Sequence, residues 1–186
     1  GYADTLTIPE YIDGKPVTRI TIWYSNSTVK EIYIPSTVTF MDYRQFSDYS
    51  KLSAIHVDSW NNAYKSIDGV LFTQDGKTLL LCPESKTGHY AVPNGVRVIG
   101  ERAFYYSRLS SVYIPDGVVE IEDFAFCCSA LSEIRIPDSV ETIGLRAFFD
   151  CELNGISFPD SLTAINQEVL DGTDTTYVAI PTSVSE

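Results

Sequence analysis

Side chains that could do catalytic chemistry are scarce in this chain. Its 186 residues include only two histidines, His56 and His89, and four cysteines. An activated nucleophile needs a base beside it, and zinc needs several N or S ligands at close spacing. No H-E-x-x-H, G-x-S-x-G or G-x-G-x-x-G motif occurs. Paired carboxylates are common, but in an acidic protein most are solvated. We therefore expect no enzyme activity, no metal and no cofactor.

One short stretch resembles the end of a phosphate-binding P-loop. Gly76, Lys77 and Thr78 have the right order, but the motif needs a glycine five residues before Gly76, and Leu71 stands there. A phosphate cradle depends on that glycine-rich turn leading into a helix. The interpretation as a nucleotide site is rejected.

The overall charge restricts the possible partners. There are 25 acidic and 13 basic residues, for a formal charge of −12 and a pI near 4.5. Such a surface repels phosphate backbones and anionic lipid heads. No apolar run approaches the roughly 18 residues that a membrane span requires. We expect neither nucleic-acid binding nor membrane insertion.

The chain is repetitive. Five prolines stand 22 residues apart, at Pro93, Pro115, Pro137, Pro159 and Pro181. The segments around the first four align as VPNGVRVIGERAF, IPDGVVEIEDFAF, IPDSVETIGLRAF and FPDSLTAINQEVL. Earlier copies begin at Ile34 and Val57, and a degenerate one lies around Val17 and Ile20. Fixed self-similarity of this length is the signature of a solenoid.

Each copy reads as one coil. The strand-like LxxVxI segment alternates as a strand with one buried face does. Proline then ends the strand because it has no N–H for a ladder, and Asp or Asn with Gly or Ser supplies a turn. No copy has ten residues of helical periodicity, so long helices are not expected.

Stacked copies should place like residues on each other. The aromatic column comprises Phe46, Phe104, Phe126 and Phe148, closed by Leu170. Alanine precedes three of them, at Ala103, Ala125 and Ala147, where coils pass closely. A buried Phe contributes about 1.5–3 kcal/mol, so this column is a large part of the expected core.

The stretch IPDSVETIGLRAFFDC resembles the BspA-like leucine-rich repeat of bacteria, IPxSVTxIGxxAFxxC, and the resemblance extends from about Ile8. Asp42, Glu122 and Asn166 replace the usual Gly. The resemblance implies one right-handed solenoid domain over 1–186, with a parallel sheet on the concave side and short turns, 3₁₀ or β segments on the convex side. Within it, 1–33 is a degenerate N-terminal coil, 58–91 a coil with an insertion, and 180–186 the start of an incomplete repeat.

The insertion is predicted to be a β-hairpin. Tyr64 to Pro83 reads as two strands joined by Asp75-Gly76, the strongest short hairpin signal. A hairpin that covers part of the convex side is the favoured interpretation. A projecting recognition element is the alternative.

The cysteines Cys82, Cys127, Cys128 and Cys151 lack CxxC spacing and are too sparse for a disulfide scaffold. Buried thiols that fill gaps between coils are expected. A Cys128–Cys151 bridge between neighbouring coils is the alternative.

Strand register predicts which side chains face outward on the concave sheet. In LSEIRIP, Leu131, Ile134 and Ile136 point inward. One outward column is then Tyr33, His56, Ala91, Tyr113, Arg135, Ser157 and Ala179. The other is Glu31, Ala54, His89, Ser111, Glu133, Gly155 and Tyr177. Aromatic residues and Arg favour interfaces, although strand propensity alone also places Tyr and His there. The candidate binding residues are Tyr33, His56, His89, Tyr113, Glu133, Arg135 and Tyr177.

The family resemblance implies a secreted or cell-surface binding module for host or cell-surface proteins or for glycans. We expect the chain to be monomeric. The first residues show no signal-peptide pattern, so the expected extracellular location rests on the resemblance. Two alternatives remain: a structural spacer in a larger surface protein, and a glycan-binding or enzyme-accessory module.

Overall fold

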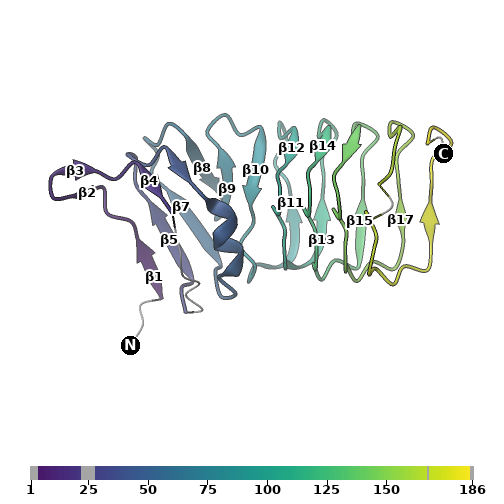
Figure 1. The fold of residues 1–186 in the computed structure, drawn as a ribbon, viewed down its shortest axis with the longest axis horizontal. Helices are drawn as coiled ribbons and strands as arrows, with labels where there is room; N and C mark the ends of the chain where they lie inside the picture. The colour runs from purple at the N-terminus through teal and green to yellow at the C-terminus, as the bar shows by residue number, and fades with distance from the viewer. Residues whose placement is uncertain (1–3, 22–27, 167, 185–186) are drawn as a thin grey trace. The chain divides into compact units, whose positions relative to one another are not determined.

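The computed structural model describes residues 4–21, 28–166 and 168–184. By their internal contacts the residues form two compact units, Gly1–Lys86 (unit 1) and Thr87–Glu186 (unit 2). Both are stacks of β-coils, and the one helical segment among the described residues is the 3₁₀ helix η1, Tyr43–Asp48 (Figure 1). The prediction of a β-rich solenoid is confirmed.

Unit 1 is built on a parallel sheet with strand order β1–β5–β7, comprising Thr5–Thr7, Glu31–Ile34 and Ala54–Val57. Register pairs Tyr33 with His56 as predicted. Strand β1 also pairs with β5, placing Thr7 opposite Tyr33. The N-terminal coil therefore supplies a regular strand, which the description of 1–33 as degenerate did not include.

The remaining short strands of unit 1 form two pairs. An antiparallel hairpin joins β2 and β3, Tyr11–Ile12 and Lys15–Pro16. A parallel pair joins β4 and β6, Arg19–Ile20 and Phe40–Met41.

The insertion has three strands, so the two-strand prediction is wrong in number. Strands β8, β9 and β10 span Tyr64–Ile67, Val70–Thr73 and Thr78–Leu81 and pair antiparallel in sequence order. The turn at Asp75-Gly76 joins β9 to β10 as predicted, and Asp68-Gly69 forms a second turn between β8 and β9. Three consecutive residues are fully or almost fully buried in both β9 and β10. This burial favours the structural interpretation of the insertion over a projecting element.

The insertion also ends the parallel sheet of unit 1. The backbone N–H of Ile55 in β7 donates to the carbonyl of Gly69 at 2.8 Å. That carbonyl belongs to the β8–β9 turn and takes a position at the edge of β7 where a further strand would bond. The parallel sheet of unit 1 thus ends at β7, and the parallel sheet expected on the concave side is divided into separate sheets.

Unit 2 repeats the coil with little variation. Its long strands β11, β13 and β15 form one parallel sheet, and β17 pairs with β18; their bounds are Thr87–Ala91, Arg108–Tyr113, Glu133–Arg135, Ile156–Ser157 and Val178–Ala179. The opposite side carries two-residue parallel strands β12, β14 and β16, at Val98–Ile99, Glu120–Ile121 and Thr142–Ile143.

The predicted Phe column is the centre of this unit. Phe104 and Phe126 stack with ring centroids 4.9 Å apart, and Phe126 and Phe148 at 5.2 Å. All three rings are fully buried, as are the alanines before them. Leu170 is only half-buried.

The segment carrying the Phe column has an unusual backbone. In each full coil of unit 2 two non-glycine residues four apart have φ between 52° and 58°: Arg102 and Tyr106, Phe124 and Cys128, Arg146 and Asp150. Left-handed conformations cost about 1–2 kcal/mol for such residues. A ladder between coils offsets this cost, for example from the N–H of Phe104 to the carbonyl of Ala125 at 2.7 Å.

All four cysteines are free thiols in the structure, and Cys82, Cys127 and Cys151 are buried. The Cys151 thiol donates to the carbonyl of Phe126 at 3.0 Å and lies 3.4 Å from the Ser129 hydroxyl. These contacts agree with the predicted use of thiols as packing groups between coils.

Candidate recognition surface

The outward column of unit 2 has the predicted register. Tyr113 on β13 lies between Ala91 of β11 and Arg135 of β15. Its side chain is 57% exposed, and Arg135 is also exposed. The buried partners Val112 and Ile114 anchor the strand below, because alternate side chains of a strand point to opposite faces.

The second outward column of the same sheet is polar. His89, Ser111 and Glu133 are register partners on successive strands. His89 Nδ1 and the Ser111 hydroxyl are hydrogen-bonded. Glu133 is exposed beside them. Five of the seven predicted site residues lie in this unit, and four of the five, all but Tyr177, lie on the single β11–β13–β15 sheet.

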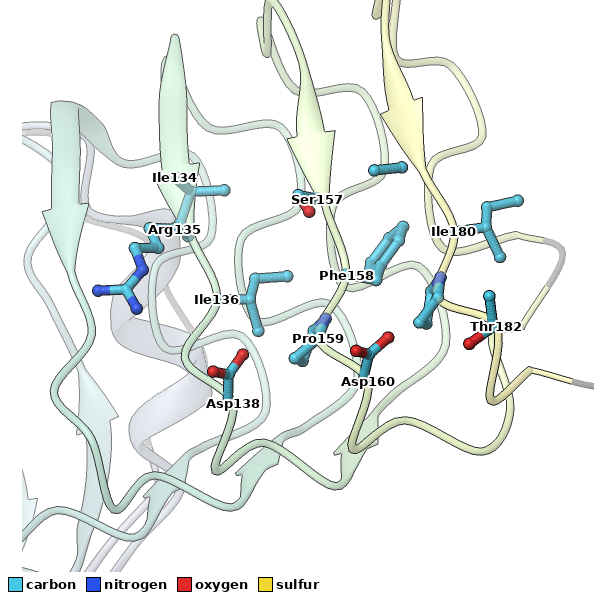
Figure 2. Close-up of a pocket in the computed structure, with 12 residues that line it drawn as sticks. Ile134, Arg135, Ile136, Asp138, Ser157, Phe158, Pro159, Asp160, Ile180 and Thr182 are labelled. Atoms are coloured by element: carbon cyan, nitrogen blue, oxygen red, sulfur yellow. The ribbon is translucent and has the colours of Figure 1, made fainter.

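Arg135 and Tyr113 are neighbours but do not stack. Among the described residues the cation–π pairs join Arg19 to Phe40, Arg102 to Tyr105 and Phe124, and Arg146 to Phe149. The two side chains therefore form no cation–π pair, and Figure 2 shows the Arg135 guanidinium directed away from Ser157. Both side chains remain open to solvent.

A groove of about 640 Å³ lies beside Arg135, along β15, β17 and β18 and the turns that follow them. Asp138 and Asp160, from successive turns, line it together with Ser157 (Figure 2). Ile136 and Phe158, both buried, support its floor. Ile180 holds the equivalent position in the last coil but is 65% exposed, since no described coil packs on it. The groove thus offers carboxylates along its edge and an apolar floor.

Tyr177 lies just before β18 and is 63% exposed. It lies beside Gly155 of the preceding coil, where an added Cβ would be 3.4–3.6 Å from Tyr177 atoms, in ordinary van der Waals contact. It is not on the β11–β13–β15 sheet.

In unit 1 the two predicted residues form a single aromatic pair. The rings of Tyr33 and His56 stack with centroids 4.5 Å apart and planes 21° from parallel. The Tyr33 hydroxyl donates to Glu31 Oε2 at 2.9 Å, and His56 Nε2 lies 3.7 Å from the same oxygen. The hydrogen bond to this carboxylate raises the pKa of Tyr33, so its hydroxyl remains a donor at neutral pH.

Sequence reasoning missed two residues beside this pair, Thr7 and Asp58. Both line a hollow of about 240 Å³ with Tyr33 and His56. The TLTIP segment alternates and ends in proline, as the later strands do, and could have revealed Thr7. Asp58 stands where the other copies have proline. In the sequence it therefore marks a departure from the repeat and gives no sign of a ligand-binding group.

The described residues contain no group of three or more His, Cys, Asp or Glu side chains arranged to hold a metal ion. No helix among them is long and apolar enough to cross a membrane.

Comparison with known proteins places these features in a family. Residues 17–78 and 83–186 match the profile described as BspA type leucine rich repeat region, in six copies. No curated protein shows significant similarity to the chain.

Among solved structures, the chain is similar to a leucine-rich cell surface protein from Faecalibacterium prausnitzii, with 28% identity and a TM-score of 0.78 over 97% of this chain and 54% of that one. A leucine-rich repeat protein from Eubacterium ventriosum gives 26% identity and a TM-score of 0.75, covering 97% and 56%. The pneumococcal vaccine antigen PcpA, at 18% identity and a TM-score of 0.70, covers 94% and 48% and shares the fold.

The chain thus spans about half the length of these proteins. The repeat profile matches most of the sequence, and the coils that it describes are those of the structure. The chain belongs to the BspA-type leucine-rich repeat family.

Proposed function

We propose that this chain is a non-catalytic recognition module of a bacterial cell-surface protein, and that it binds a protein partner through the outward face of its long parallel strands. The observation that carries the proposal is the β11–β13–β15 face, where exposed Tyr113 and Arg135 are register partners on adjacent strands and exposed Glu133 lies on the same strand as Arg135. Tyr and Arg dominate the energetics of protein interfaces.

The scaffold supports this role because its sheet is held in place independently of any partner. Buried strand residues and the Phe column fix the backbone below the face, so binding need not order it. The name of the Faecalibacterium relative, a cell surface protein, supports the location.

A spacer that binds nothing is the competing function. Both functions are compatible with a stable stack of coils, but a spacer has no need for the exposed Tyr113 beside Arg135, a pair of residue types that favours protein interfaces.

The test is direct binding of the purified chain to immobilised extracellular-matrix proteins and to glycans, followed by surface plasmon resonance. The proposal expects saturable binding to at least one protein, abolished by heat unfolding of the chain. Absence of saturable binding to any protein on the panel favours the spacer, and binding confined to glycans favours the accessory alternative.

A further inference from the structure

A hollow beside Tyr33 in unit 1 is open to solvent and of a size to take one side chain. It measures about 240 Å³ and is lined by eight residues at the carboxyl ends of three strands: Thr7, Ile8, Tyr33, Ile34, Pro35, His56, Val57 and Asp58. We name it the Tyr33 hollow. Ligand pockets for whole small molecules are usually larger, about 300–1,000 Å³. A single planar group is the better match in size.

One face of an aromatic ring is open toward this hollow. The Tyr33 ring is covered on one side by His56, with which it stacks. On the other side its register partner is Thr7, a much smaller side chain. The ring face opposite His56 is therefore directed along the column toward Thr7, and the Tyr33 side chain as a whole is 40% exposed.

The aromatic pair is preorganised. The Glu31 carboxylate accepts a hydrogen bond from the Tyr33 hydroxyl and lies near His56 Nε2, so it holds both rings. Neither ring has to rotate to present the second face of Tyr33. A ligand that stacks there does not have to immobilise a mobile side chain, which otherwise weakens binding.

The charge around the hollow is negative. Asp58 lines it, and Glu31 holds the aromatic pair. Glu10 is close by, because its carboxylate accepts the hydroxyl of Ser36, the neighbour of the lining residue Pro35. None of the eight lining residues is Lys or Arg.

Asp58 retains capacity to bind a ligand. Its Oδ1 accepts the backbone N–H of Trp60 at 2.8 Å, which fixes the carboxylate in the turn after β7. The second oxygen forms no hydrogen bond or ion pair with another described residue, so it can accept a hydrogen bond from a bound cation.

From this geometry we propose that the Tyr33 hollow binds a cationic side chain, arginine in particular, presented by a basic segment of the protein partner. This inference rests on the proposed function and names the chemistry of its partner. A guanidinium is planar, stacks on aromatic faces and donates to carboxylates at the same time. The hollow offers an open tyrosine face with the Asp58 carboxylate beside it. The carboxylates around the hollow, with no Lys or Arg among its lining residues, favour a basic partner over an acidic one.

The test is an NMR titration of the whole chain, labelled with ¹⁵N and ¹³C. Two probes with uncharged termini are used, N-acetyl-arginine methylamide and the corresponding citrulline compound. Citrulline has nearly the same shape but no charge. We expect arginine to shift the ring resonances of Tyr33 and His56 and the amide of Asp58 in a saturable manner. Citrulline should bind at least tenfold more weakly, and 0.5 M NaCl should weaken arginine binding.

Matched variants locate the effect. Asp58→Asn keeps an oxygen for the Trp60 N–H and should weaken arginine binding about tenfold, and Tyr33→Ala should abolish it. Tyr113→Ala in unit 2 is the control and should leave it unchanged. The ¹⁵N spectrum of each variant shows whether it is folded.

Equal shifts with arginine and citrulline, or arginine binding that survives both unit 1 substitutions, would overturn the inference. Saturable shifts of the same resonances with a neutral disaccharide and none with arginine would replace it with a glycan site. This inference and the proposed function can fail separately. If only substitutions in the β11–β13–β15 face abolish protein binding, the proposed recognition module stands and this inference fails.

Discussion

Phe126 has an aromatic neighbour on both sides, in the coil before and the coil after. Phe126→Ala removes the middle ring of the stack and leaves a cavity that the rigid ladder cannot close. We expect it to lower the free energy of unfolding by about 3–5 kcal/mol, measured by urea denaturation. Tyr113→Ala, on the outward face of the same unit, is the control and should cost less than about 0.5 kcal/mol. A loss under about 1 kcal/mol for Phe126→Ala contradicts the stacked register.

The thiols give a second residue-scale prediction. Burial raises the pKa of Cys82 to about 12, and it also raises the pKa of Cys127 and of Cys151. The three groups stay protonated at pH 8, so only the half-buried Cys128 should react readily with iodoacetamide in the native protein. Four thiols per chain should titrate after denaturation without reductant. Fewer than three would instead support the Cys128–Cys151 bridge.

The same raised pKa values predict how stability depends on pH. A thiol whose pKa is higher in the folded than in the unfolded chain stabilises the fold below the unfolded value of about 9. That contribution is lost as the pH rises from about 9 toward 12, because the unfolded chain then ionises first. We expect the urea midpoint to be flat between pH 7 and pH 8 and to fall by pH 10.5. An unchanged midpoint at pH 10.5 is inconsistent with buried thiols.

At the scale of elements, the turn between β8 and β9 is where the insertion packs against strand β7 of the parallel sheet in unit 1. Gly69 has φ of +76°, and a Cβ there would lie 2.9 Å from the Cβ of Ala54. Gly69→Ala should destabilise the chain by about 1–3 kcal/mol, since it adds backbone strain to a steric clash. Gly14→Ala has a similar φ of +73° but meets nothing within 4 Å, so it should cost less. Equal losses of unfolding free energy in both would mean that the β8–β9 turn does not pack on β7.

The elements show what sequence periodicity can and cannot predict. The 22-residue spacing of proline and the LxxVxI pattern were sufficient for the coil, the register and the Phe column, because each coil contacts its neighbours in the same way. The end of the sheet at β7 depends on one tertiary hydrogen bond, from Ile55 to Gly69, which no periodicity encodes. The third strand of the insertion was missed because the second Asp-Gly pair, at Asp68, was read as strand.

The candidate surface was predictable in part for similar reasons. Strand alternation placed Tyr113, Arg135 and Glu133 outward correctly. It could not show that Arg135 and Tyr113 form no cation–π pair, which depends on rotamers. Nor could it show the left-handed residues such as Arg102, since no glycine marks them.

For the whole molecule, the negative charge is unevenly distributed. Residues 87–186 carry 15 acidic and five basic side chains, whereas residues 1–86 carry ten and eight. Unit 2 therefore has a formal charge of −10 and unit 1 only −2. Arg135 is thus a positive group on a strand of the more acidic unit, where only five of the 100 residues are basic.

The central claim is that the outward face of the long strands binds a partner, and the most direct measurement compares two double variants for affinity. Tyr113→Ala with Arg135→Ala should leave the unfolding free energy within about 0.5 kcal/mol, because both side chains face solvent. It should weaken binding to the partner found on the protein panel by more than tenfold, about 1.4 kcal/mol. Lys77→Ala with Thr78→Ala, at the β9–β10 turn, should leave affinity unchanged. The opposite result, with affinity lost at Lys77 and Thr78 and retained in the Tyr113 and Arg135 variant, would contradict the account and place the site on the insertion.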